Sequence, residues 1–201
     1  MDAIIGQFHQ PQPHLMRITG GTLLGRKLNV PHLPHVRPTT DRARESLFNW
    51  LSNRVDFSNC RLTELFAGSG VVSFEMLSRG ATKAICVDIQ KTCCVAIQTI
   101  AHHWGLPVEV VCADALAYMK NASAVDLVFA DPPYRLPELY ILPHKIMESP
   151  LLSQGGSLIL EHDRANNFES HPYFQESRRY GEAVFSIFGL SPSSIASKST
   201  L

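Results

Sequence analysis

The chain has 201 residues, of which 45% are hydrophobic and 18% charged, and its formal net charge is +0. A chain of this length can bury a core without disulfide bonds or metals, so the composition indicates a soluble globular domain. Zero net charge argues against nonspecific coating of nucleic acid. No segment is long and apolar enough to cross a bilayer, and the first residues lack a secretion signal. We therefore expect a cytoplasmic protein.

Cysteine and histidine usage gives no sign of a metal site or a disulfide framework. The five cysteines are odd in number and form no CxxC pair. Reduced, mostly buried thiols are the expected state. The nine histidines show no metal-ligand spacing such as HExxH, so we expect no bound metal.

The chain is predicted to divide into a disordered lead-in at 1–15, a basic hairpin and connector at 16–40, a main domain at 41–190 and a flexible tail at 191–201. Within the second part, residues 16–30 favour a hairpin, because Gly20, Gly21 and Gly25 mark turns. Residues 41–53 favour a helix with apolar residues at helical spacing, and Thr40 or Thr39 is its expected N-cap.

The basic residues gather near the start of the chain. Residues 17–45 hold six basic side chains against Asp41 and Glu45, a local balance of +4, so the remainder carries −4. The six are Arg17, Arg26, Lys27, Arg37, Arg42 and Arg44. A basic patch on a neutral body favours targeted contact with phosphates. For Arg42 and Arg44, pairing with the two acids on an exposed helix face is the alternative.

From residue 61 apolar strands alternate with helical patterns. Strands are predicted at 62–66, 84–87, 108–111, 127–130 and 157–160, and helices at 71–79, 91–103, 115–120 and 138–148. This alternation indicates βαβ units and a parallel sheet covered on both faces. Two further strands, at 173–179 and 183–188, are joined at Gly181. The short link between them predicts an antiparallel hairpin, which makes an α/β sheet of seven strands, mostly parallel.

The first of these strands runs into a glycine loop, Glu64-Leu-Phe-Ala-Gly-Ser-Gly70. Gly68 and Gly70 allow the backbone to approach a ligand, and the following helix offers free N–H groups. Ser73 stands where a dinucleotide-binding fingerprint has glycine. The Gly-x-Gly pattern alone is therefore weak evidence for a nucleotide-like ligand, and the neighbouring residues must decide.

Acids follow the next three strands at Asp88, Asp114 and Asp131. Any one of them could be a helix cap. Four acids, with Glu64, beside a glycine loop favour a ligand site, because the carboxyl ends of parallel strands meet at one edge. Asp131 begins Asp131-Pro-Pro-Tyr134, a loop stiffened by two prolines, which offers an acceptor and an aromatic face to a flat base carrying an amino group.

Together these motifs resemble the class I methyltransferases, which have a Rossmann-like fold and use S-adenosylmethionine, and in particular the amino methyltransferases with a (D/N)PP(Y/F) motif. The resemblance implies catalytic roles for Asp131, Pro132, Pro133 and Tyr134. It implies cofactor contacts for Glu64, Phe66, Ala67, Gly68, Ser69, Gly70, Asp88, Ile89, Asp114, Ala115 and Asp131. Glu64 stands where such enzymes usually carry Asp.

The stretches Gly20–Leu28 and Arg37–Leu51, with Arg-Pro-Thr-Thr-Asp-Arg-Ala-Arg-Glu in the second, closely resemble the bacterial RsmD family. The resemblance runs from about Met16 to Phe188. It implies methylation of the N2 amine of one guanine in 16S ribosomal RNA, within an assembled 30S subunit, with S-adenosylmethionine as cofactor. We expect a monomer that contacts RNA through the six basic residues.

Three alternatives remain open from the sequence. The acceptor could be a DNA adenine or cytosine, or a protein glutamine, although no separate DNA-reading domain is evident. The same sheet could serve a nucleotide-binding oxidoreductase, against which Ser73 and the Asp-Pro-Pro-Tyr loop both count. The chain could also be a non-catalytic ribosome-assembly factor, which the intact acids and glycines disfavour.

Overall fold

The computed structural model describes residues 14–30, 40–133 and 135–189. Of the residues predicted to act in the site, Arg37 and Tyr134 lie outside this part, as does most of the predicted lead-in and all of the predicted tail. The helices and strands are β1 (His14–Arg17), β2 (Lys27–Val30), α1 (Asp41–Ser52), β3 (Arg61–Leu65), α2 (Val71–Ser78), β4 (Lys83–Asp88), α3 (Lys91–Trp104), β5 (Val108–Cys112), α4 (Ala115–Met119), β6 (Val125–Ala130), α5 (Leu142–Met147), β7 (Leu152–His162), β8 (Phe174–Tyr180) and β9 (Ala183–Gly189), with short 3₁₀ turns at Gly21–Leu23 and Phe57–Asn59.

The main sheet has seven strands in the order β5-β4-β3-β6-β7-β9-β8. Strands β3, β4, β5, β6 and β7 pair with one another in parallel, and β9 is antiparallel to both β7 and β8. The predicted fold class is confirmed, including the antiparallel hairpin at the end of the chain. The strand order reverses between β3 and β6, and in open α/β sheets that switch point is where ligands bind.

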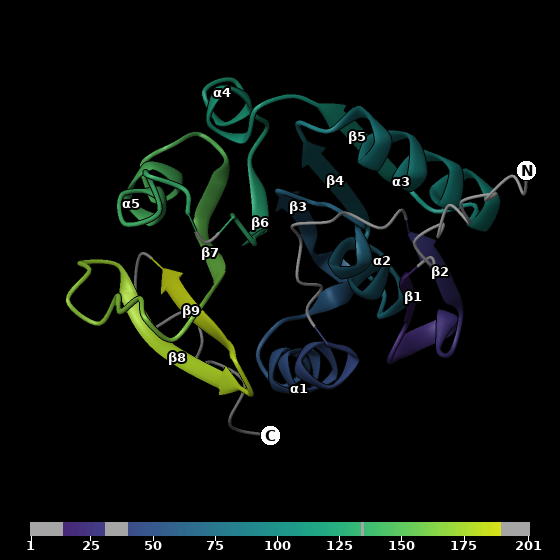
Figure 1. Cartoon of the computed structure of the whole chain (residues 1–201), viewed down its shortest axis with the longest axis horizontal. Helices are drawn as coiled ribbons and strands as arrows, with labels where there is room; N and C mark the ends of the chain where they lie inside the picture. The colour runs from purple at the N-terminus through teal and green to yellow at the C-terminus, as the bar shows by residue number, and fades with distance from the viewer. Residues whose placement is uncertain (1–13, 31–39, 134, 190–201) are drawn as a thin grey trace, which may run out of the picture.

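Helices cover both faces of this sheet. In Figure 1, α4 and α5 lie on one side and α1, α2 and α3 on the other, and a separate buried cluster of apolar side chains fills each interface. All eight residues of α2 are buried, because the helix lies between the sheet and the N-terminal hairpin. The faces of the sheet are thereby closed, and its carboxyl edge is the place left for chemistry.

The N-terminal hairpin is part of the same core. Strands β1 and β2 pair antiparallel, and Met16, Ile18 and Leu28 are buried with the side chains of α1 and α2. Strand β1 begins at His14, so the predicted lead-in of fifteen residues is too long by two. The Thr40 side chain accepts a hydrogen bond from the Ala43 N–H, which confirms it as the N-cap of α1.

Two elements differ in length from their predictions, and each difference has a local cause. The helix predicted at 138–148 starts at Leu142, where Pro143 occupies the first turn, the position in which its missing N–H does no harm. Strand β7 is longer than predicted, because it passes through Gly155 and Gly156 and carries an irregularity opposite the start of β6. Glycines hide such a segment from a search for apolar alternation.

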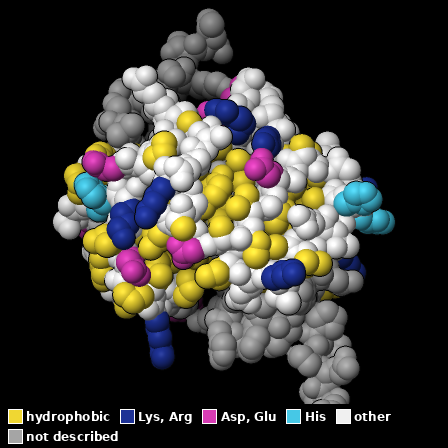
Figure 2. Space-filling view, turned by 90° about the horizontal axis from the view of Figure 1, so that it is seen from above, with side chains coloured by type: hydrophobic (Ala, Val, Ile, Leu, Met, Phe, Trp, Pro, Cys, Tyr) yellow, Lys and Arg dark blue, Asp and Glu magenta, His cyan; other side chains and the backbone are white. Residues whose placement is uncertain are grey.

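On the face of the molecule shown in Figure 2, apolar side chains gather near the centre, and charged side chains are scattered around them. Within the three described segments, no helix has the length and apolar character needed to span a membrane.

Candidate active site

The glycine loop leaves β3 through a left-handed turn. The backbone φ values of Phe66, Gly68 and Gly70 are 57°, 51° and 70°. Residues other than glycine rarely adopt this left-handed region. The Ala67 N–H donates to the Val87 carbonyl over 3.0 Å, so the loop is fastened across the end of β4. A Cβ on Gly68 would find no atom nearer than 3.9 Å, which leaves open space beside the backbone of the loop.

Asp88, the last residue of β4, holds this loop in place. One carboxylate oxygen, Oδ2, accepts from the Gly68 N–H over 2.8 Å, and Oδ1 accepts from the Gln90 N–H over 2.7 Å. The residue is 9% exposed, and Ile89 beside it is 69% exposed. A carboxylate at the edge next to a large exposed aliphatic side chain suits a ligand that has hydroxyl groups at one end and a flat ring at the other.

Glu64 lies deeper than the sequence suggests. It is 3% exposed, and its Oε2 accepts from the Ser73 N–H over 2.8 Å, in the first turn of a helix whose N-cap, Gly70, provides no side-chain acceptor. Burial raises the pKa of Glu64 to about 7. Its contacts are those of a helix cap beneath the loop, and they offer no support for a direct contact with a cofactor.

Asp114 lies at the same edge and has a capping role of its own. Cys112, at the end of β5, pairs in register with Asp88, and Asp114 follows two residues later. Its side chain accepts from the Ala117 N–H over 2.9 Å and caps α4, whose first residue, Ala115, is buried. Capping accounts for the contacts of Asp114, so its cofactor role stays a prediction.

Asp131 directly follows β6 at the switch point. Ala130 pairs with Leu65 on one side and with Leu160 on the other, which places Asp131 beside the start of the glycine loop and beside Glu161. The pKa of Asp131 is raised well above its usual value. The largest cause is burial, and the negative charges of Glu161 and Glu64 add to it. Within the described segments no ion pair reaches it.

The two prolines after Asp131 form a fixed corner. Pro132 is buried and Pro133 exposed, and the Pro133 carbonyl accepts from the Leu136 N–H over 2.8 Å. Glu161, 3% exposed, was not predicted as part of this site. The signal was present, since Glu161 directly follows the apolar run 157–160 of a predicted strand, as Asp131 follows 127–130.

The predicted RNA contacts divide into exposed and buried residues. The exposed ones are Arg17, Arg26, Lys27 and Arg42. Arg44 is wrong as a surface contact, because its side chain is 0% exposed and lies between Asp41, at 2.9 Å, and Glu75, at 3.6 Å. The alternative, pairing of Arg44 with Asp41, is found, but the Arg44 side chain is buried instead of lying on an exposed helix face.

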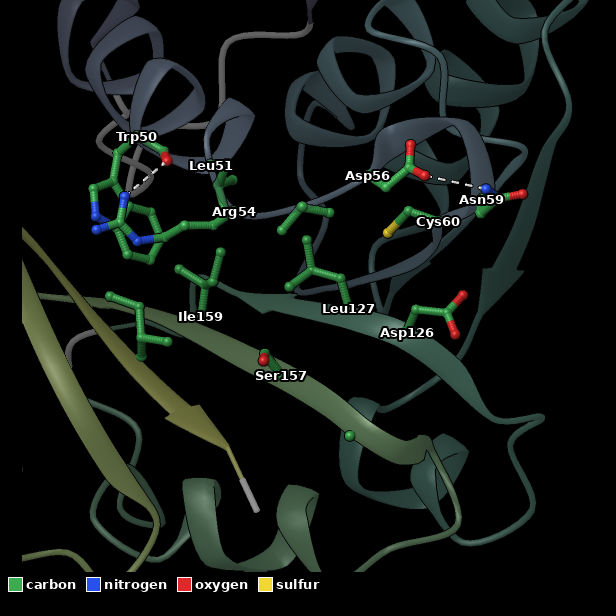
Figure 3. Close-up of a pocket in the computed structure, with 13 residues that line it drawn as sticks. Trp50, Leu51, Arg54, Asp56, Asn59, Cys60, Asp126, Leu127, Ser157 and Ile159 are labelled. Carbon is green, nitrogen blue, oxygen red and sulfur yellow. Dashed lines mark hydrogen bonds between the residues drawn. The ribbon is translucent and has the colours of Figure 1, made fainter. Parts of the chain in front are cut away.

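A cavity of about 220 Å³ lies away from this edge. Figure 3 shows it between Trp50 and Arg54, at the end of α1, and the side chains of Leu127 and Ile159 on β6 and β7. Asp126, at the start of β6, also lines it, so it opens toward the amino ends of the strands. In the described part of the chain, no three metal-binding side chains come together.

Comparison with known proteins gives concordant matches. The family described as conserved hypothetical protein 95 matches residues 16–189. "Ribosomal RNA small subunit methyltransferase D" of Escherichia coli (strain K12) is 40% identical over 124 residues, which are 60% of this chain and 61% of that protein. The rRNA methyltransferase candidate YlbH of Bacillus subtilis (strain 168) is 35% identical over 158 residues, covering 74% of this chain and 83% of its own.

A solved structure of the methyltransferase candidate yhhF from Escherichia coli superposes with a TM-score of 0.75 at 26% identity. The superposition covers 88% of this chain and 98% of that one. The sequence match to the Escherichia coli methyltransferase D, by contrast, spans less than two thirds of that relative's length.

Proposed function

The chain belongs to the conserved hypothetical protein 95 family, and from this membership and the geometry of its carboxyl edge we propose that it transfers a methyl group from S-adenosylmethionine to the N2 amine of a guanine in 16S ribosomal RNA. One observation carries the proposal. The glycine loop, Asp88 and Asp131 converge at the switch point of the sheet, because Asp88 holds the loop and Asp131 emerges from the strand next to it.

The residues at the edge fit S-adenosylmethionine. The space beside Gly68 admits a ligand against the loop backbone, and Asp88 has acceptor capacity for ribose hydroxyls beyond the two N–H groups it already binds. Ile89 would cover one face of the adenine. When bound, the cofactor supplies an electrophilic methyl group on a sulfonium. Glu64 acts from below by holding α2 and the loop in register.

Asp131 and the Pro132 carbonyl orient the amine. An exocyclic amino group is a poor nucleophile, because its lone pair is conjugated into the ring. Acceptors that bind its two hydrogens direct that lone pair out of the ring plane and toward the methyl group, so that catalysis depends mainly on positioning and electrostatics. After transfer the nitrogen is positively charged and loses a proton readily. Asp131, as an acceptor of one of the amine's hydrogens, is placed to take that proton.

The exposed basic side chains of the hairpin and α1 supply phosphate contacts for the RNA. Arg17, which also pairs with Asp41 at 3.0 Å, lies on β1, while Arg26 and Lys27 lie at the start of β2. Arg37 remains a predicted contact. We further propose that the acceptor is the assembled small subunit, that one guanine is taken out of its stack to reach Asp131, and that the enzyme acts as a monomer.

Asp131→Ala tests this function. Methyl transfer from labelled S-adenosylmethionine to 30S subunits should fall at least 100-fold, while the Kd for S-adenosylhomocysteine stays within a few fold. Asp126→Asn, at the other end of β6, is the matched control and should keep near wild-type activity. A variant at Asp131 that still methylates subunits would remove the residue from the reaction. Transfer to duplex DNA or to a release factor, with none to subunits, would favour the other acceptors.

Asp88→Ala tests the cofactor assignment separately. Losing an acceptor that holds the loop and faces the ribose should raise the Kd for S-adenosylhomocysteine about 10-fold or more, measured by titration calorimetry. Unchanged affinity would contradict the assignment. If wild type instead bound a nicotinamide cofactor at micromolar concentration, and no S-adenosylhomocysteine, the oxidoreductase alternative would hold.

A further inference from the structure

An exposed strip that combines aromatic, aliphatic and cationic side chains lies at the start of α5. Tyr140 is 57% exposed and Ile141 50% exposed, although the residues on either side, Leu139 and Leu142, are buried. His144 and Lys145, on α5, are also exposed, and Lys145 follows four residues after Ile141, one helical turn along the same side. The Lys145 N–H donates to the Ile141 carbonyl over 3.0 Å, which confirms this turn.

Tyr140 is held from behind by a row of rings. Its ring centroid is 5.5 Å from that of Phe168, at an interplanar angle of 37°, and Phe168 lies 4.9 Å from His162 in a T-shaped contact. Phe168 and His162 are 3% and 2% exposed. An exposed aromatic ring backed in this way is a rigid surface, and little conformational entropy is lost when a ligand lies on it.

This row begins at the same edge as the candidate active site. His162 ends β7, two residues after Leu160, which pairs with Ala130, and Asp131 follows Ala130. Residues 135–141 make tight turns, and the Leu136 N–H donates to the Pro133 carbonyl over 2.8 Å. Tyr140 is therefore fixed to the proline corner on one side and to the end of β7 on the other.

We propose that Tyr140 is a stacking platform for an unpaired RNA base next to the methylated guanine, with Lys145 near the neighbouring phosphate. This inference rests on the proposed function. Taking one base out of a stack leaves its neighbours unstacked, and proteins that bind single strands combine aromatic rings with nearby cations. Two exposed cations accompany the ring, Arg135 at the start of the turns and Lys145 at the strip itself, in a segment that also carries Glu138 and Glu148.

Four variants separate stacking from simple apolar contact. In methylation of 30S subunits, Tyr140→Ala should raise KM on the order of tenfold with kcat little changed. Tyr140→Leu should behave like Tyr140→Ala, whereas Tyr140→Phe should stay near wild type. Val95→Ala, another exposed apolar position, on α3, is the matched control and should change nothing. Circular dichroism and the Kd for S-adenosylhomocysteine verify that each variant is folded.

A second readout does not depend on catalysis. Binding of single-stranded oligoadenylate, measured by fluorescence anisotropy, should weaken in Tyr140→Ala and Tyr140→Leu and persist in Tyr140→Phe. Lys145→Ala should lower the slope of affinity against salt concentration. If Tyr140→Leu matches wild type in both assays, the strip makes an ordinary apolar contact and stacking is refuted. If wild type binds oligoadenylate through Tyr140 but methylates no subunit, the proposed function fails while the platform stands.

Discussion

Glu75 and Asp131 are carboxylates of the same domain, one fully buried and one partly exposed, and their surroundings are opposite. Glu75, on α2, is 0% exposed and receives hydrogen bonds from the Thr19 N–H at 2.8 Å, the Thr19 hydroxyl at 2.6 Å and Arg79 at 2.9 Å. The Arg44 guanidinium is 3.6 Å away. Asp131 instead has like charges, Glu161 and Glu64, as its electrostatic neighbours, and both raise its pKa.

The difference separates a structural charge from a functional one. Among the described residues, the hydrogen-bond and ion-pair partners of Glu75 are donors or cations, and they come from the hairpin, α1 and the end of α2, so the cluster joins these three elements. At the carboxyl edge, the buried acids Glu64 and Glu161 lie near Asp131, an arrangement that destabilises the fold and is typical of sites that handle protons or bind amines. The N-terminal region is thereby fixed in place, while the edge retains unused acceptor capacity.

The strongest test of this comparison is Glu75→Ala. Removing one partner from a buried cluster leaves the Arg44 and Arg79 guanidinium groups without their shared carboxylate, so the free energy of unfolding should fall by about 3–5 kcal/mol. Urea denaturation measures this loss. Lys83→Ala is the control, because its pair with Glu109 is about half exposed on both sides and should be worth under about 1 kcal/mol. Equal effects in the two variants would break the comparison.

The second test, Glu64→Gln, measures how much a negative charge on Glu64 destabilises the folded state. Because the folded state raises the pKa of Glu64 from 4.5 to about 7, it binds more protons than the unfolded state between these values, and stability falls as pH rises through that window. Glutamine cannot ionise, so the free energy of unfolding of the variant should rise relative to that of wild type, by on the order of 3 kcal/mol between pH 4 and pH 8. Unfolding curves at several pH values provide the measurement.

The third test, Asp126→Asn, should change the pH dependence of stability in the direction opposite to Glu64→Gln. Hydrogen bonds from Arg61 and Ser153 outweigh desolvation and lower the pKa of Asp126 below 3.8. Its carboxylate therefore contributes stability above that value, and this contribution is lost as pH falls through the depressed pKa. Relative to wild type, the asparagine variant should accordingly lose stability as pH rises from that depressed pKa to 3.8, and the difference should be nearly constant at higher pH. If both variants drifted in the same direction, the pH dependence would not come from these local environments.

Much of the fold could be predicted because its pattern is local. Apolar strands alternating with helical segments indicated the parallel sheet, and the link at Gly181 indicated the final hairpin. The positions of Asp88 and Asp131 at one edge followed from the geometry of parallel strands. Sequence spacing could not give the order of the strands or the partners of each carboxylate, since these depend on contacts between distant segments.

Two residues show where local reasoning failed. Arg44 looked like an exposed basic residue, yet Arg44, Leu47 and Leu51 recur at helical spacing and share one buried face. The buried partner that makes this possible, Glu75, lies 31 positions along the chain. Glu161 was overlooked because the late strand was identified from its apolar residues alone, although its final acid lies beside Asp131 and acts on its pKa.

The smallest expected effect concerns backbone strain at the edge. Ala at either Gly70 or Gly105 must adopt a positive φ, near 70° or 65°, which costs about 1–2 kcal/mol. At Gly105, the C-cap of α3, an added Cβ meets no atom within 4 Å, so Gly105→Ala should show that cost alone. At Gly70 the Cβ would lie 3.0 Å from Ile97 Cγ1, so Gly70→Ala should lose about 1 kcal/mol more in urea denaturation. Equal losses would mean that the loop yields freely, and the rigid seat for a ligand inferred at Gly68 would then lose its support.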